Sequence, residues 1–216
     1  QMCNDILNND LSAGLDDGIE ADFALHNCRV MRNRLTNCFV GISSQPGLGG
    51  PNYFLRNVLY NIVYEPFKLH RFSQGDVIQH NTVVKAGDGF GIYTSEPFDH
   101  AVITHNLFIV GKPPASTYGG YSTGRGRAVD VQHFGDHCII DHNAYAVIGM
   151  PFEGKIRTWT FQKLPGTEFE KHGRVLEVKV SPPEDPAKLY QPQDLSALTE
   201  AGAYAGENVP VYGPRP

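Results

Sequence analysis

The chain has 216 residues, of which 41% are hydrophobic and 19% charged, and its formal net charge at pH 7 is -5. This composition excludes an intrinsically disordered chain and supplies enough apolar material for one sizeable domain. The negative charge argues against a nucleic acid partner, and no segment approaches the roughly 18 to 20 apolar residues of a membrane span. The chain opens on Gln1 inside a repeat unit, so we expect an upstream N-terminal segment or chain.

Six asparagines mark equivalent points of one repeating unit, and the steps between them are 24, 24, 24, 25 and 37 residues. An apolar residue stands three positions before each asparagine, and another stands two positions after it. A period of this length predicts an all-β parallel β-helix of about six coils, in which equivalent residues stack about 4.8 Å apart. The asparagines, which we expect to hydrogen-bond along the stack without a catalytic role, are Asn9, Asn33, Asn57, Asn81, Asn106 and Asn143.

The repeat divides the chain into two parts. Residues 1–149 are predicted to form the coils, with a loop insertion over residues 111–137. Residues 150–216, where the period is lost, are predicted to form a C-terminal cap and an extended tail that cover the open end of the solenoid. Each coil should contain a strand that leads into the asparagine and a second strand about ten residues later.

The second strand of each coil alternates apolar and polar residues, so stacking should collect the polar side chains on one outer face. Glu20 and Lys68 lie two coils apart in this alignment, about 9.6 Å if each coil rises about 4.8 Å. The predicted catalytic residues are Glu20, Lys68, His70 and Asp17. Lys68 or His70 would accept a proton, while Glu20 or a bound cation neutralises a substrate carboxylate. The alternative is a Glu20–Lys68 salt bridge, with His70 as an ordinary surface residue.

A calcium site is a second hypothesis for the same segment. Asp17, Glu20 and Asp22 are candidate ligands, because hard oxygen atoms are dense there. The Asp16–Asp17–Gly18 run also fits ordinary turn chemistry, in which an aspartate bonds its own backbone. Both interpretations are open on the sequence alone.

Two further groups of residues are predicted to contact a substrate. The residue before each ladder asparagine forms an outward row that turns basic, and this row either holds an anionic polymer or is a solvated face that discourages aggregation. The 111–137 insertion places tyrosines and arginines on a Gly and Ser background, as expected for a loop that covers a ligand. The predicted substrate-binding residues are Arg32, Arg56, His80, Tyr93, Tyr118, Tyr121, Arg125, Arg127 and Asp130.

The strings LDDGIEADFALHNCRVMRNRLTNCFVGIS, RNVLYNIVYEPFKLH and IQHNTVV resemble the right-handed parallel β-helix proteins of the pectate-lyase-like superfamily, of the secreted bacterial carbohydrate-active type. The resemblance implies a right-handed parallel β-helix here. The resemblance implies a secreted, periplasmic or surface protein that acts on polysaccharides. Many lyases of this group use a lysine base with an arginine and carboxylate-bound calcium. Lys68 matches the base, and Glu20 with Asp16, Asp17 or Asp22 matches the carboxylates, whereas no arginine is clearly placed in the same stack.

These observations together predict a carbohydrate-active enzyme. We expect it to degrade an acidic or plant/algal polysaccharide, by β-elimination or by hydrolysis, in a groove on the outer face of the β-helix. The alternative is a non-catalytic glycan-binding or surface structural protein that holds sugar in the same groove.

Overall fold

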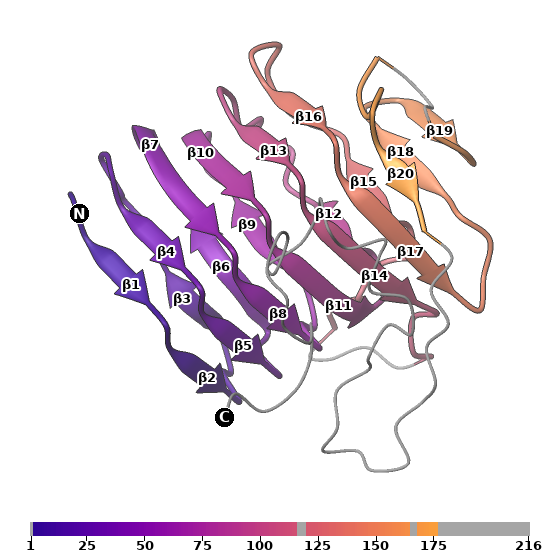
Figure 1. Cartoon of the computed structure of the whole chain (residues 1–216), viewed down its shortest axis with the longest axis horizontal. Helices are drawn as coiled ribbons and strands as arrows, with labels where there is room; N and C mark the ends of the chain where they lie inside the picture. Colours follow the sequence, from indigo (N-terminus) through magenta and orange to yellow (C-terminus); the bar gives the residue numbers. More distant parts are fainter. Residues whose placement is uncertain (1, 116–119, 165–167, 177–216) are drawn as a thin grey trace.

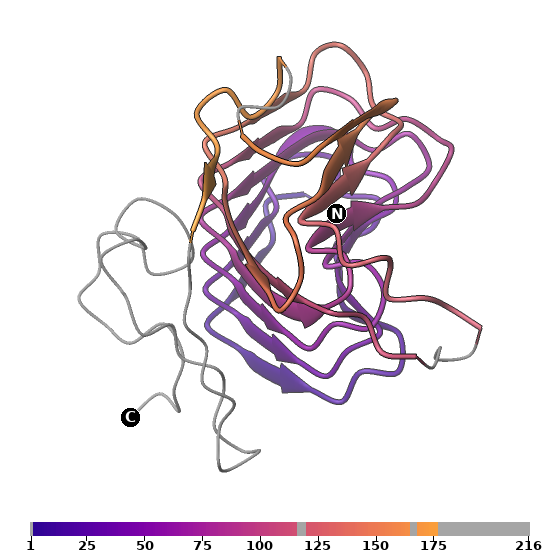
Figure 2. The same cartoon turned by 90° about the vertical axis from the view of Figure 1, so that its right-hand side faces the viewer.

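The computed structural model describes residues 2–115, 120–164 and 168–176, and these residues form a parallel β-solenoid (Figure 1). Viewed from its C-terminal end, the coils lie over one another around a shared interior (Figure 2). Tyr118 and the predicted tail beyond residue 176 lie outside the described residues. In the part of the chain that the structure describes, no helix has the length and apolar character needed to cross a membrane.

Each coil contributes up to three strands, one more than the sequence predicted. The first sheet contains β1 (Asp5–Leu7), β4 (Arg29–Met31), β7 (Leu48–Leu55), β10 (Gln74–Gln79), β13 (Val102–Thr104) and β16 (Ile139–Asp141). The second contains β2 (Asp10–Ser12), β5 (Arg34–Thr36), β8 (Val58–Tyr60), β11 (Thr82–Ala86), β14 (Leu107–Gly111), β17 (Ala144–Ile148) and β20 (Arg174–Val175). The third side consists of two sheets, β3 (Asp17–Glu20), β6 (Val40–Ser44) and β9 (Phe67–Leu69), and then β12 (Phe90–Ile92), β15 (Val129–Val131), β18 (Gly154–Ile156) and β19 (Trp159–Phe161).

The strand register confirms the predicted stacking of apolar residues. The column before the ladder is Ile6, Val30, Phe54, Ile78, Ile103 and Ile140, and the column after it is Leu11, Leu35, Leu59, Val83, Phe108 and Tyr145. From the second coil onward every member is buried. Burying one such side chain stabilises a fold by about 1.5 to 3 kcal/mol, so these columns form the core of the solenoid.

The chain turns between the first and second sheets within two residues. The first of these residues adopts a positive φ between 54° and 59° although it is never glycine: Asn8, Arg32, Arg56, His80, His105 and His142. The second is the ladder asparagine, which is fully or almost fully buried from Asn33 onward. A non-glycine residue in the left-handed region is strained, so the contacts of the neighbouring asparagine have to hold this corner.

The asparagines form a continuous hydrogen-bonded column. In each step the Nδ2 atom donates to the Oδ1 atom of the next asparagine over 2.9 to 3.1 Å, and the backbone N–H donates to the same oxygen over 2.9 to 3.0 Å. From Asn33 onward, Nδ2 also donates to a carbonyl of the preceding coil over 2.8 to 2.9 Å. Each internal side chain therefore has its polar atoms satisfied, as burial requires.

Glu170 ends the column in place of a further asparagine. Its Oε1 atom accepts hydrogen bonds from Asn143 Nδ2 and from the Tyr145 hydroxyl, both over 2.7 Å. Burial raises the pKa of Glu170 to about 7, although these hydrogen bonds act in the opposite direction. Parallel stacking thus continues past residue 149, since β18 pairs with β15 and β20 with β17, while β19 pairs antiparallel with β18 at the end of its sheet.

We expect Asn57→Ala to lower the free energy of unfolding by about 2 to 4 kcal/mol, because buried N–H groups of Asn33 lose their acceptor and the buried carbonyl of Val30 loses its donor. Asn81 Oδ1 keeps the backbone N–H of residue 57. Urea denaturation followed by circular dichroism measures this change. Asn9→Ala is the matched control, because Asn9 is the exposed first member of the column. Equal losses for the two variants would contradict a stabilising role for the buried column.

We expect stability to fall as the pH rises from about 4.5 to 7, because native Glu170, with its raised pKa, binds a proton in that window that the unfolded chain has released. Glu170→Gln should make this fall shallower but not abolish it, since burial also raises the pKa of Asp76 to about 6. Urea titrations at several pH values give the slope. The exposed Glu168→Gln should keep the wild-type slope, and an unchanged slope in Glu170→Gln would refute the assignment.

Candidate functional site

The outer face of the third side carries the residues predicted to be catalytic. Glu20, Ser43 and Lys68 are aligned by strand pairing, so the expected placement of Lys68 two coils from Glu20 is confirmed. The salt bridge of Lys68, however, is made with Asp17, whose Oδ2 atom lies 2.5 Å from Nζ. Asp17 is almost fully buried, and its Oδ1 atom has no hydrogen-bond partner among the described residues. Lys68 is therefore already engaged in an ion pair with Asp17.

The candidate calcium ligands do not converge on one point within the described residues. Asp22 accepts hydrogen bonds through Oδ1 from the Ser43 hydroxyl, over 2.6 Å, and from the Gln45 amide, over 2.9 Å. Asp17 already faces the ammonium group of Lys68, and Glu20 is exposed. The three carboxylates therefore do not fit a shared calcium ion, which needs six to eight oxygen ligands around one centre.

His70 forms a carboxylate–imidazole pair with a residue that the sequence did not point to. Its Nε2 atom lies 2.9 Å from Oε2 of Glu65, and the Glu65 side chain is 0% exposed whereas that of His70 is 21% exposed. The contact is an ion pair by distance, because neither of these two atoms makes a hydrogen bond with a described residue. The second oxygen of Glu65 accepts the backbone N–H of Tyr93 over 2.8 Å. Glu65 thus lies against His70 and is hydrogen-bonded to the next coil.

A pocket of about 400 Å³ opens between the third side and the long loop. Glu65 and His70 do not line it, but Tyr93, whose backbone N–H binds Glu65, does. The ring centroid of Tyr64 lies 5.2 Å from that of Tyr93 and 5.2 Å from that of Tyr121. Burial raises the pKa of Tyr64 to about 12, so its hydroxyl stays protonated at neutral pH. The lining residues are Tyr64, Asp88, Tyr93, Gly120, Tyr121, Ser122, Gly124, Arg125 and Asp130. The pocket therefore combines aromatic surface with two carboxylates and an arginine.

Asp88 holds the long loop against the solenoid. Its Oδ1 atom accepts the backbone N–H groups of Arg125, Gly126 and Arg127 over 2.8, 2.8 and 2.7 Å. Its Oδ2 atom accepts the Tyr93 hydroxyl over 2.8 Å. Gly124 has a φ of 94°, and a Cβ atom there would lie 2.2 Å from the Asp88 carboxyl group, so only glycine permits this approach. A single buried carboxylate thus fixes the wall of the pocket.

A chain of charged and polar groups continues along the same face. Arg127 binds Asp130 over 2.6 Å and Glu153 over 2.5 Å. Gln132 Nε2 donates to Asp130 over 2.9 Å and Gln132 Oε1 accepts from Lys155 over 2.7 Å. Arg127 and Asp130 are therefore fixed before any ligand arrives.

Lys85 is a buried cation beneath the pocket. Its side chain donates to the Tyr64 carbonyl over 2.6 Å. Burial lowers the pKa of Lys85 to about 8, while Asp88 and Glu65 raise it. Lys85 and its two acidic neighbours were missed by the sequence analysis. The strand TVVKA did place Lys85 among apolar residues, but the segments VYEPF and KAGDG resemble ordinary turns.

The remaining predicted substrate-binding residues separate into two surfaces. Tyr93, Tyr121, Arg125 and Asp130 come together in the pocket, with Arg127 behind it. The others follow the corner between the first and second sheets, where the rings of His80 and His105 stack with centroids 5.2 Å apart. Burial, helped by Arg56 and His105, lowers the pKa of His80. The corner residues, which are not part of the pocket, are Arg32, Arg56 and His80.

Comparison with known proteins gives no relative. No family model matches the chain, and no curated protein or solved structure shows significant similarity to it.

We expect Asp88→Ala to release the loop around residues 124–127, because three backbone amides lose their common acceptor. Arg125 and Arg127 lie in that segment, so limited trypsin digestion should cleave the variant several-fold faster there, as mass spectrometry of the fragments would show. Asp136→Ala is the control, since it removes an exposed carboxylate that binds Arg157. Equal cleavage rates in wild type and Asp88→Ala would contradict the anchoring role.

Proposed function

We propose that this protein binds an acidic polysaccharide along the outer face of the third side and cleaves it next to the tyrosine-lined pocket. The observation that carries the proposal is the Glu65–His70 pair: a partly exposed imidazole held 2.9 Å from a fully buried carboxylate. An imidazole that lies against a buried carboxylate while its other edge reaches solvent is an arrangement used by histidine general bases. Among the described residues of this face, it is the only ion pair that contains an imidazole.

The pocket has the composition of a sugar-binding site. Aromatic rings of Tyr64, Tyr93 and Tyr121 provide apolar surface for a sugar ring, and carboxylates provide acceptors for hydroxyl groups. Arg125 is exposed at the pocket and makes no ion pair with a described residue, so its guanidinium group is free to bind a uronate carboxylate. Lys68, fixed by Asp17, places a second positive charge on the same face.

β-Elimination is the reaction that these groups support best. The imidazole of His70 removes the proton from the sugar carbon next to the uronate carboxylate. The electron pair of that C–H bond forms a carbon–carbon double bond, and the adjacent bond to the glycosidic oxygen breaks. The leaving oxygen takes up a proton from solvent, and Arg125 or Lys68 neutralises the charge that develops on the carboxylate. A polysaccharide substrate implies a secreted, periplasmic or surface location.

A non-catalytic glycan-binding protein is the second candidate, and a specific observation favours it. The pocket carboxylates are engaged, because Asp88 accepts four hydrogen bonds and Asp130 binds Arg127 and Gln132. Hydrolysis needs two available carboxyl groups about 5 to 9.5 Å apart, one of them able to donate a proton. This arrangement therefore suits binding or elimination better than hydrolysis.

We expect the wild-type chain, incubated with a panel of uronate polysaccharides, to release products that carry the ultraviolet absorbance of an unsaturated uronate. His70→Ala should lower kcat by about 10² to 10⁴. Tyr121→Ala should instead raise KM, because it removes aromatic surface from the pocket. The exposed His133→Ala is the matched control and should behave as wild type.

The outcomes separate the two candidates. Saturable binding without product in the wild type would establish the non-catalytic protein and reject elimination. Product formation that survives His70→Ala unchanged would remove His70 from the mechanism. Neither binding nor product with any acidic polysaccharide would overturn the proposal as a whole.

A further inference from the structure

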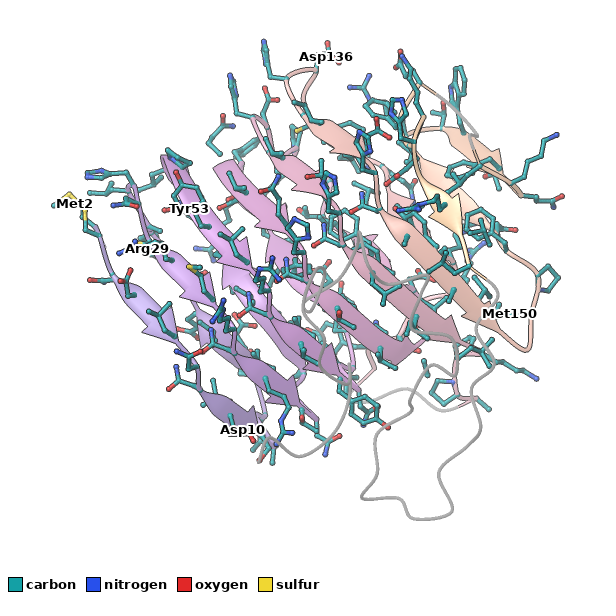
Figure 3. The ribbon with its side chains drawn as sticks, viewed as in Figure 1. Met2, Asp10, Arg29, Tyr53, Asp136 and Met150 are labelled. Atoms are coloured by element: carbon teal, nitrogen blue, oxygen red, sulfur yellow. The ribbon has the colours of Figure 1, made fainter. Side chains whose placement is uncertain are left out.

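Two clusters of one aspartate and two histidines stand at the two ends of β16, in a different sheet from the proposed saccharide site. Asp99, His100 and His137 form the first, where the chain enters β13 and β16. Asp141, His142 and His172 form the second, where the chain leaves β16. In each cluster one potential metal-ligating atom per residue lies within 4.8 Å of the others. Figure 3 labels Asp136 at the outer turn that leads into β16, and His137 follows it directly.

Both clusters have the same construction. In the first, Asp99 Oδ1 accepts the backbone N–H groups of His100 and His137 over 2.8 and 3.1 Å. In the second, Asp141 Oδ1 accepts those of His142 and His172 over 2.8 and 2.7 Å. One carboxylate oxygen is thus used to join two coils, and the other is left facing the imidazoles.

The atoms that face each other in the first cluster have the spacing of metal ligands. Asp99 Oδ2 lies 2.9 Å from His137 Nδ1 and 3.5 Å from His100 Nδ1. Gln74 Oε1 lies 3.2 Å from His100 Nδ1, within hydrogen-bond distance of that ring nitrogen. Two ligand atoms that each lie about 2.0 to 2.1 Å from a tetrahedral zinc ion are about 3.3 Å from each other. The distances between the atoms of the first cluster lie on either side of this value.

The second cluster is a slightly wider version of the first. Asp141 Oδ2 lies 2.7 Å from His172 Nδ1 and 3.8 Å from His142 Nε2. The two rings stack with centroids 4.5 Å apart, compared with 4.4 Å between His100 and His137. The nitrogen atoms nearest the carboxylate in the second cluster are Nδ1 of His172 and Nε2 of His142.

We propose that the two clusters are binding sites for a divalent first-row transition ion such as zinc. Two imidazole nitrogens and one carboxylate oxygen favour such an ion over calcium or magnesium, which prefer oxygen ligands. The histidine rings are exposed, with side-chain exposures of 59% for His100, 66% for His137 and 64% for His172, so water completes the coordination. Each ion would join the ends of adjacent coils on the first sheet.

Zinc titration of the chelator-treated, dialysed chain by isothermal calorimetry tests the proposal. We expect two saturable sites per chain. His137→Ala and His172→Ala should each halve the amount of zinc bound, and the double variant should bind none. His133→Ala, an exposed histidine outside both clusters, and Cys3→Ser, an exposed thiol, are controls that should keep both sites.

A measurement on the wild-type chain keeps the test independent of how the variants fold. Zinc should shift the backbone amide NMR resonances of the six cluster residues and leave those of His26 and His133 in place. Absence of saturable binding, unchanged zinc content in the double variant, or shifts confined to residues outside the clusters would each overturn the proposal. Activity toward polysaccharides plays no part in either measurement.

Discussion

The hydrogen-bonded asparagine column holds the register on which the rest of the molecule depends. Each step of the column joins the same atoms of two consecutive asparagines. The column therefore fixes both the stacking of the coils and the register of the residues in them. The step from Asn106 to Asn143 shows this most clearly. Thirty-seven residues separate these two asparagines, yet their side-chain hydrogen bond is 2.9 Å long, as in the 24-residue step from Asn9 to Asn33. The long loop therefore leaves and rejoins the solenoid without disturbing the core.

Each of the buried carboxylates near the pocket lies beside an opposite charge or a hydrogen-bond donor. Glu65 faces His70, Asp88 accepts backbone amides, and Asp130 faces Arg127. Removing such groups from water is costly unless their partners are in place, so a network of this kind is rigid. The rigidity positions the imidazole and the tyrosine rings before a ligand binds, which reduces the entropy lost on binding.

Sequence reasoning located the repeat and both apolar columns, because stacked residues in a solenoid recur at a constant spacing. It also aligned Glu20 with Lys68 and predicted substrate-binding roles for Tyr93, Asp130 and, in the long loop, Tyr121, which the structure brings together in one pocket. It could not identify the partners of these side chains. Lys68 reaches Asp17 rather than Glu20 because a lysine extends across coils in a direction that spacing does not specify.

The residues that were missed share a physical reason. Glu65 and Asp88 lie between strands, where no period applies, and their burial follows from the long loop and from the next coil. Glu170 occupies the ladder position in a segment where the asparagine signal has ended, so only coordinates reveal it as the last member of the column. The two Asp–His dipeptides were visible in the chain, but the second histidine of each cluster comes from another coil.

The attachment of the long loop has a consequence for how this architecture diversifies. Asp88 binds main-chain amides, so it holds this segment without contacting its side chains, and glycine is required only at positions 124 and 126, where φ is 94°. Substitutions in that segment therefore change the chemistry offered to a ligand while leaving the anchor and the solenoid intact. A protein with this fold can therefore change its ligand specificity through substitutions in this one surface loop, at little cost to folding.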